Sequence, residues 1–197
     1  MRSFLPKRIP TGTRYYRMGP VLDQGSTPMC VGYGWRQWLS SAVLMTKDGP
    51  SAPVIYREAQ KLDEWPGEDY DGTSVRGGVK ALQERGHVAS YVWAFDAATA
   101  RDWILAGKGT VVFGTDWYEG MFDPDAKHFL NLSGGVAGGH CYLVCGYSSE
   151  RKAFRIVNSW GAGWGDKGRA WIRFDDADRL IKAAGEACTA VEQKVKA

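Results

Sequence analysis

Cys30 lies where the surrounding sequence could make a thiol reactive. It follows Pro28 and begins an apolar pattern at helical spacing that extends to Thr46, ahead of the helix-ending residues Asp48-Gly49-Pro50. The thiolate is the nucleophilic form of cysteine, and its usual pKa of about 8.5 falls at a helix N-terminus or beside an imidazolium. The spacing therefore predicts a mostly buried helix over residues 30–46, with the Cys30 thiol facing a cleft from the first turn.

Gln24 stands six residues before Cys30, across a turn that contains Gly25 and Pro28. Acyl transfer places negative charge on a carbonyl oxygen, and one pre-aimed donor commonly lowers the barrier by about 3–4 kcal/mol. The Gln24 amide could be one donor and the backbone N–H of Cys30 the other, because first-turn amides lack a helical partner. Taken alone, a glutamine here would more often be an ordinary loop residue.

His140 is the candidate acid and base. It precedes the apolar run 141–147, which predicts a largely buried strand, and a glycine-rich loop leads into it. From this position an imidazole could form an ion pair with the Cys30 thiolate and then protonate the leaving amine. His87 and His128 lie in segments without comparable neighbours, and we interpret both as structural or surface residues.

Asn158 follows a second predicted strand, residues 152–157, which a polar turn joins to the first. Antiparallel pairing of the two strands would return Asn158 to the side of His140. Its amide oxygen could then accept a ring N–H and fix the orientation and tautomer of the imidazole, as the third member of a catalytic triad does. Trp160 would shield that bond from water. For Asn158 alone, a polar residue at a strand end is the competing interpretation.

The chain resembles the papain family of cysteine peptidases in a set of short motifs spread over residues 20–175. They are Asp23-Gln24-Gly25, Cys30, Gly139-His140, and Asn158-Ser159-Trp160-Gly161-Ala162-Gly163-Trp164-Gly165. The resemblance implies that Cys30 is the nucleophile and His140 the acid and base, with Asn158 as the orienting residue and Gln24 as the oxyanion donor. It also implies an α+β fold of two lobes, one mainly helical and one β-barrel-like, with a peptide or protein substrate in the cleft between them.

Some positions depart from the family pattern. Val31 stands where members usually carry a tryptophan, so we expect Trp35 to build that wall of the site or the wall to be missing. Thr27 occupies the position at which secreted members place a disulfide-forming cysteine. Only 23 residues precede Gln24, so the family's long inhibitory propeptide is expected to be missing, which resembles a bacterial or bacteriophage-encoded member.

Two residues are candidates for substrate binding by the same resemblance. In the family, a strand that follows the lobe crossover lines the pocket for the residue preceding the one cleaved. The nearest match here places Gly114 in that strand, where it would leave room for a bulky apolar side chain. Trp160 is a candidate for the cleft.

Periodicity predicts the elements that must position these residues. Helical patterns cover 55–65, 74–85 (ended by Gly86), 97–106 (behind the N-cap Asp96) and 176–184, whereas strand patterns cover 110–113, 140–147, 152–157, 168–174 and 187–192. The 197 residues suit a single catalytic domain. We place its lobe boundary near Lys108, giving a helical lobe of about residues 20–107 and a β lobe of about residues 108–192.

Composition argues against several classes of protein. The formal net charge is +3 with the two signs interspersed, so no nucleic-acid partner is expected. No signal peptide and no stretch approaching the ~18 apolar residues of a membrane span is visible, so no membrane association is expected.

The cysteines indicate a compartment. Cys141 and Cys145 would lie ~13 Å apart on one strand, too far for a disulfide. We expect them and Cys188 to be buried free thiols in a reducing, cytoplasmic setting. No Cys-x-x-Cys pair is present, so neither a metal nor a cofactor is expected.

Three functions are compatible with this set of residues. The first is a thiol peptidase that works through an acyl-enzyme thioester. The second is another thiol acyl-transfer enzyme, such as a cell-wall amidase or a transglutaminase, against which Gln24 and the Asn-Ser-Trp-Gly block argue. The third is a non-catalytic protein on the same scaffold, which the intact set of Cys30, His140, Asn158 and Gln24 makes a poor fit.

Overall fold

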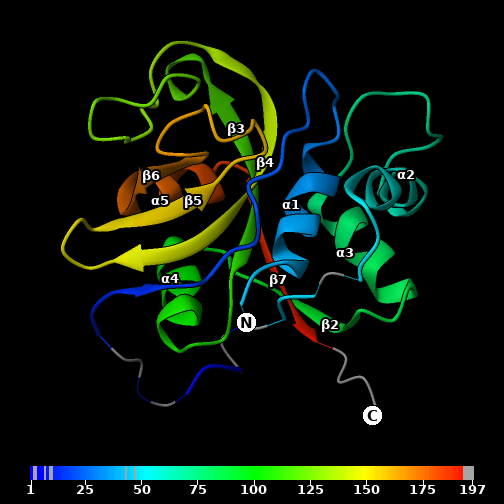
Figure 1. Ribbon diagram of the computed structural model, residues 1–197, viewed down its shortest axis with the longest axis horizontal. Helices are drawn as coiled ribbons and strands as arrows, with labels where there is room; N and C mark the ends of the chain where they lie inside the picture. The colour runs from blue at the N-terminus through cyan, green and yellow to red at the C-terminus, as the bar shows by residue number, and fades with distance from the viewer. Residues whose placement is uncertain (2–3, 7, 9–10, 43, 47, 193–197) are drawn as a thin grey trace.

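The structure is a computed structural model that describes residues 1, 4–6, 8, 11–42, 44–46 and 48–192. Val43, which the predicted 30–46 helix includes, lies outside the described residues. Three helices stand side by side in one half of the molecule, and most of an antiparallel sheet with two further helices forms the other half (Figure 1). The chain thus has the expected α+β architecture with two lobes.

The helices are close to those that the sequence predicts. They are α1 (Cys30–Leu39), α2 (Ala52–Leu62), α3 (Val75–Glu84), α4 (Ala97–Leu105), α5 (Phe174–Lys182) and the short 3-10 helix η2 (Glu119–Met121). Two N-caps satisfy amides that have no helical partner. The Ser74 hydroxyl accepts the Gly77 N–H at 2.9 Å, and the predicted Asp96 cap accepts the Thr99 N–H at 2.6 Å.

The predicted 30–46 helix was too long. α1 ends before Ser40, whose hydroxyl donates to the carbonyl oxygen of Arg36 at 3.0 Å. The backbone N–H of Ala42 then donates to the carbonyl oxygen of Arg17 at 2.8 Å, so this segment pairs with the N-terminal part of the chain. The spacing of apolar residues within a segment does not reveal hydrogen bonds to a segment far away in the sequence.

The predicted helix at 55–65 was placed three residues too late. α2 begins directly after Ser51, and Pro53 lies in its first turn. A proline is tolerated there because its missing N–H would have no helical partner. Asp63 adopts an extended conformation and ends the helix.

Within the described residues the sheet has seven strands, and each neighbouring pair is antiparallel. The strands are β1 (Arg14–Tyr15), β2 (Val88–Trp93), β3 (Val111–Tyr118), β4 (Val136–Ser148), β5 (Ala153–Val157), β6 (Arg169–Arg173) and β7 (Glu186–Glu192). Their order is β2-β7-β3-β4-β5-β6, with β1 paired to β4. β2 was missed from the sequence. β3 continues past the predicted 110–113, because Gly114 pairs with Cys141 and Thr115 with His140.

Alternation along β3 and β4 joins the two lobes. Phe113 and Tyr142 belong to the apolar cluster of the β half, whereas Val112 and Cys141 belong to the cluster that surrounds α1. Neighbouring residues of one strand thus point into different cores. The lobe boundary near Lys108 stays a prediction.

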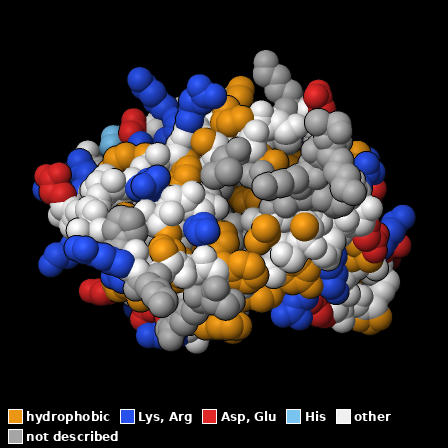
Figure 2. Space-filling model, turned by 90° about the horizontal axis from the view of Figure 1, so that it is seen from below, with side chains coloured by type: hydrophobic (Ala, Val, Ile, Leu, Met, Phe, Trp, Pro, Cys, Tyr) orange, Lys and Arg blue, Asp and Glu red, His pale blue; other side chains and the backbone are white. Residues whose placement is uncertain are grey.

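Seen from below, apolar side chains gather in the middle of the face, and charged side chains are more frequent toward its two ends (Figure 2).

The contact between α1 and α3 requires a glycine. An added Cβ at Gly78 would lie 2.3 Å from Cδ1 of Trp35 and 2.8 Å from Cγ1 of Val31. We therefore expect Gly78→Ala to lower the free energy of unfolding by about 1–3 kcal/mol, as overpacking does. Urea unfolding would measure this. Gly163→Ala is the control, since no atom lies within 4 Å of that Cβ position, and equal stability of both variants would contradict the packing argument.

Candidate active site

A cavity of about 470 Å³ lies where the two lobes meet, and α1 begins at its edge. Cys30, the first residue of α1, lines this cavity together with His140 on β4 and Gly114 on β3. The Cys30 thiol is partly buried. Residues far apart in the sequence are thus brought to one cavity, as expected for the predicted nucleophile and base.

β4 and β5 bring His140 and Asn158 together. Asn158 directly follows β5, whose last residue Val157 pairs with Leu143 on β4. Nε2 of His140 lies 2.7 Å from Oδ1 of Asn158, and the same oxygen accepts the backbone N–H of Ser159 at 2.8 Å. Because an amide oxygen only accepts hydrogen bonds, Nε2 carries the ring proton and Nδ1 keeps its lone pair.

Two indole rings enclose the imidazole. The ring centroids of Trp160 and Trp117 lie 4.7 and 4.8 Å from that of His140. Asn158 is fully buried beneath them. Trp160, which the sequence suggested as a shield for this bond, lies against the imidazole. Trp117 was not anticipated, because an aromatic residue on a buried strand looks like any other core residue.

Gln24 is held against the residue next to Asn158. Its backbone N–H donates to the Ser159 carbonyl oxygen at 2.8 Å, and its side-chain Oε1 accepts the Ser159 hydroxyl at 2.6 Å. Nε2 of Gln24 donates to the Thr27 carbonyl oxygen at 2.7 Å. An amide has two N–H bonds, so the second remains for another acceptor. Ser159 therefore fixes which end of the Gln24 amide carries the donor.

The surroundings of the thiol and the imidazole disfavour charge on each of them. Burial raises the pKa of Cys30, and backbone N–H groups of Cys141, Val31 and Cys30 itself oppose that shift. Burial lowers the pKa of His140 to about 4, and the hydrogen bond to Asn158 opposes the shift. Each group alone is thus neutral at pH 7, and an ion pair between them would depend on their mutual attraction.

Other sequence expectations have mixed outcomes. Val31 lines the cavity, but Trp35 does not build the missing wall. It is fully buried, and its Nε1 donates to the Val75 carbonyl oxygen at 3.0 Å, so it serves the core of the helical lobe. Gly114 lines the cavity, and its role in substrate binding stays a prediction. Trp160 contacts the imidazole but does not line the cavity.

Glu186 is a cavity residue that sequence reasoning missed. Its Oε2 accepts the backbone N–H of Val75 at 2.9 Å, and it lines the cavity beside Gly114. Burial raises the pKa of this carboxyl. No local motif marks it, because β7 reaches this place only through its pairing with β3.

Cys141, Cys145 and Cys188 are buried, and burial raises the pKa of each thiol. Among the described residues, no group of three or more side chains is arranged to hold a metal ion. Within the same part of the chain, no helix has the length and apolar character needed to cross a membrane.

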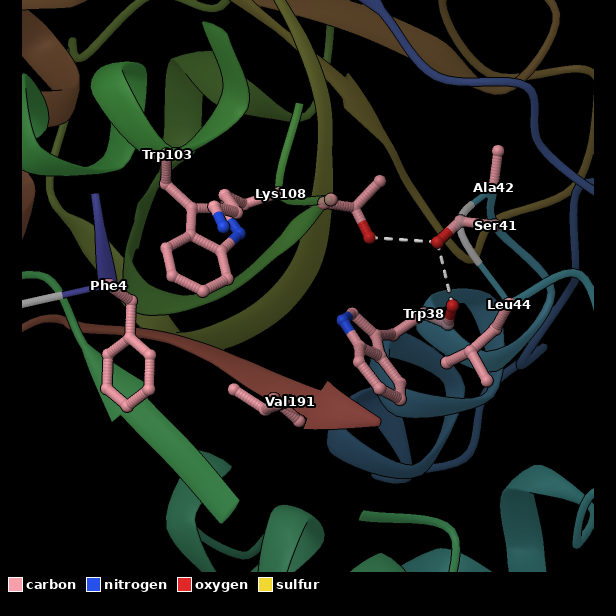
Figure 3. Close-up of a pocket in the computed structure, with 11 residues that line it drawn as sticks. Phe4, Trp38, Ser41, Ala42, Leu44, Trp103, Lys108 and Val191 are labelled. Atoms are coloured by element: carbon pink, nitrogen blue, oxygen red, sulfur yellow. Dashed lines mark hydrogen bonds between the residues drawn. The ribbon is translucent and has the colours of Figure 1, made fainter. Parts of the chain in front are cut away.

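A second cavity of about 410 Å³ lies near the other end of α1 (Figure 3). Trp38, Leu44 and Val191 give it mainly apolar walls. Its two hydroxyls satisfy each other, since Ser41 and Thr110 are 2.9 Å apart and Ser41 also donates to the Trp38 carbonyl oxygen (Figure 3). It shares no lining residue with the cavity of Cys30.

Comparison with solved structures shows that the fold is papain-like. Xylellain, a cysteine protease from Xylella fastidiosa, matches with a TM-score of 0.78 and 20% identity, over 98% of this chain and 90% of that one. Digestive procathepsin L 3 of Tenebrio molitor larval midgut matches with a TM-score of 0.73 and 14% identity, over 94% and 71%. Bromelain from Ananas comosus matches with a TM-score of 0.58 and 16% identity, over 89% and 94%.

Two curated proteins share shorter stretches with the chain. A cathepsin B-like cysteine proteinase 3 of Ostertagia ostertagi is 30% identical over 101 residues, which is 49% of this chain and 57% of that protein. A cathepsin B-like cysteine proteinase of Schistosoma japonicum is 30% identical over 70 residues, 34% of this chain and 20% of that protein. The chain thus spans less than two thirds of the length of these relatives. No family model matches it.

The low pKa of His140 makes stability depend on pH. Above pH 6.5 the imidazole is mainly neutral in both the folded and the unfolded state, so its contribution to the free energy of unfolding is fully present. As the pH falls toward 4, the unfolded chain binds a proton that the folded chain does not. We expect wild type to lose about 3 kcal/mol more unfolding free energy over this range than His140→Gln. Urea unfolding at several pH values measures this, and parallel curves would contradict the low pKa.

Proposed function

We propose that this chain with a papain-like fold is a cysteine peptidase that hydrolyses peptide bonds of peptide or protein substrates. One observation supports this most directly. The 2.7 Å bond from His140 to Asn158 holds the imidazole at a cavity that Cys30 also lines. A thiol at a helix start and an oriented base are the parts that nucleophilic acyl transfer needs.

Acylation begins at the thiol. Nδ1 of His140 takes the proton of Cys30, and the sulfur attacks the carbonyl carbon of the scissile bond. The imidazolium then donates its proton to the leaving amine, so the C–N bond breaks and an acyl thioester remains. In the second half, water loses a proton to His140 and attacks the thioester, which releases the acid and restores the thiol.

The oxyanion formed in each half needs donors. The backbone N–H of Cys30 lies in the first turn of α1, where amides have no helical partner. Gln24 supplies the second donor through the Nε2 hydrogen that Thr27 does not use. Ser159 supports this role, because its hydroxyl holds Oε1 and so prevents the amide from presenting an acceptor to the oxyanion.

The side-chain preference follows from Gly114 and Glu186. An added Cβ at position 114 would lie 2.5 Å from Cγ2 of Val75 and 3.8 Å from Oε2 of Glu186. The methyl group of Val75 thus fills the space next to the Gly114 backbone, and the carboxyl group of Glu186 lies beside it. We expect this part of the cavity to accept a long side chain with an apolar stem, and a cationic end would meet the carboxylate.

The alternative functions predict different products. An amidase or a transglutaminase would use the same thiol and base, but it would need a peptidoglycan fragment or an amine acceptor in place of a peptide and water. The likeness in fold to solved proteases favours hydrolysis of peptides. The buried free thiols of Cys141, Cys145 and Cys188 suit a reducing, cytoplasmic compartment.

Removal of the nucleophile tests the proposal. We expect Cys30→Ala to abolish peptide hydrolysis and labelling by a thiol-directed epoxide, because no second thiol replaces it, while the urea midpoint stays close to wild type. Cys145→Ala is the control, since Cys145 does not line the cavity, and it should retain both. Peptides, peptidoglycan fragments and amine acceptors are assayed side by side. Labelling of Cys141 in the Cys30→Ala variant would contradict the assignment of the nucleophile.

Gln24 tests the oxyanion site separately. We expect Gln24→Ala to lower kcat by ~10²–10³ with little change in KM, because the lost donor acts on charge that develops in the transition state. Steady-state kinetics on a peptide substrate measures this. Gln83→Ala removes an exposed amide that donates to the Ala89 carbonyl oxygen and should leave kcat unchanged. A rise in KM alone for Gln24→Ala would mean that Gln24 binds substrate instead.

A further inference from the structure

Another cavity, distinct from that of Figure 3, lies on the β lobe and has a volume of about 490 Å³. It shares no lining residue with the cavity of Cys30. Four of its lining side chains are cationic, Lys127, Arg151, Arg155 and Arg169, and one is a carboxylate, Asp166. The proposed peptidase chemistry uses none of them. We propose that this cavity is a binding site for a tetrahedral oxyanion, either inorganic phosphate or the phosphate group of a monoester.

The cavity is built across four strands. Tyr15 on β1 pairs with Gly146 on β4, Gly146 pairs with Arg155 on β5, and Arg155 pairs with Trp171 on β6. Paired residues lie on the same face of an antiparallel sheet. An added Cβ at Gly146 would lie 2.4 Å from Cδ1 of Tyr15, so the glycine lets this ring cross the sheet toward Trp171, 6.0 Å away. These pairings place Arg155 on the same face as the Trp171 ring, which Tyr15 contacts at its edge.

The Arg155 side chain is held in place, but not all of its N–H groups have a hydrogen-bond partner. Its guanidinium lies 4.8 Å from the Trp171 ring centroid, and its Nη2 forms an ion pair with Asp166. The side chain is only 12% exposed. Its Nη1 is buried and has no hydrogen-bond partner among the described residues. Leaving a charged buried donor without an acceptor is costly, and an anion in the cavity would supply the acceptor.

The charges around Arg155 favour a dianion. Arg151 lies 4.9 Å from the same Trp171 ring, and none of the ion pairs in the described part of the chain includes Arg151 or Lys127. The carboxylate of Asp125 accepts the backbone N–H groups of Lys127 and Phe129, so it is already engaged. A carboxylate would balance only one of the excess positive charges. A phosphate dianion would balance two and offers oxygens in several directions.

Titration calorimetry with sodium phosphate tests the site at constant ionic strength. We expect saturable binding with one phosphate per chain and much weaker binding of acetate, which has a single charge. O-phosphoserine is titrated in parallel: binding comparable to phosphate identifies monoesters as ligands, and weaker binding identifies the free ion. Heat that never saturates, or acetate binding as tight as phosphate binding, would overturn the proposal.

Variants locate the binding on the protein. Arg155→Lys keeps the positive charge but removes the planar guanidinium with its several N–H donors. Arg151→Ala changes an exposed side chain, with little risk to folding. We expect phosphate to bind about tenfold more weakly to each, as for loss of one charge-assisted hydrogen bond. Lys108→Ala removes the same charge at the cavity of Figure 3 and should bind like wild type. Equal affinity of all three variants would place the ion elsewhere and overturn the proposal.

Discussion

The hydrogen bond from His140 to Asn158 is the constraint on which the rest of the site depends. It joins the beginning of the buried part of β4 to the residue after β5, so the register of these two strands decides whether the bond can form. Once formed, it selects the ring tautomer and leaves Nδ1 as the basic nitrogen. A slip of one residue in either strand would turn one of the two side chains to the opposite face of the sheet.

The same strand also fixes the partner of the imidazole. Cys141, the next residue, points away from His140 into the apolar cluster around α1, and an added Cβ at Gly34 would lie 2.8 Å from its sulfur. α1 therefore approaches β4 closely only because Gly34 has no side chain. This contact between Gly34 and Cys141 fixes the position of α1 along β4, and it therefore also fixes the position of Cys30 at the start of the helix. One strand thus presents His140, the proposed base, on one face and contacts the helix of Cys30, the proposed nucleophile, with the other.

Much of this arrangement could be predicted because its signals are local. The caps at Asp96 and after α3, the strands at β4 and β5, and the Asn-Ser-Trp-Gly motif each lie within a few residues. The predictions that failed concern features set by contacts between residues far apart in the sequence. α1 stops early because Ala42 bonds to Arg17, and Trp35 is buried because α3 covers it. Glu186 enters the cavity on a strand whose position depends on β3, and no local pattern encodes that neighbour.

Burial of the site has an electrostatic consequence for any chemistry at Cys30. It raises the pKa of the thiol and lowers that of the imidazole, so both groups favour their neutral forms when considered singly. The thiol with imidazole and the thiolate with imidazolium share the same single proton, and activity would require that proton in either case. Gain of a second proton in acid or loss of the first in alkali would therefore end activity whichever form predominates at rest. The environment that makes the resting pair neutral also strengthens the attraction between the charges once a proton moves, because the site is shielded from water. Burial thus suits a nucleophile that is ionised only when it attacks.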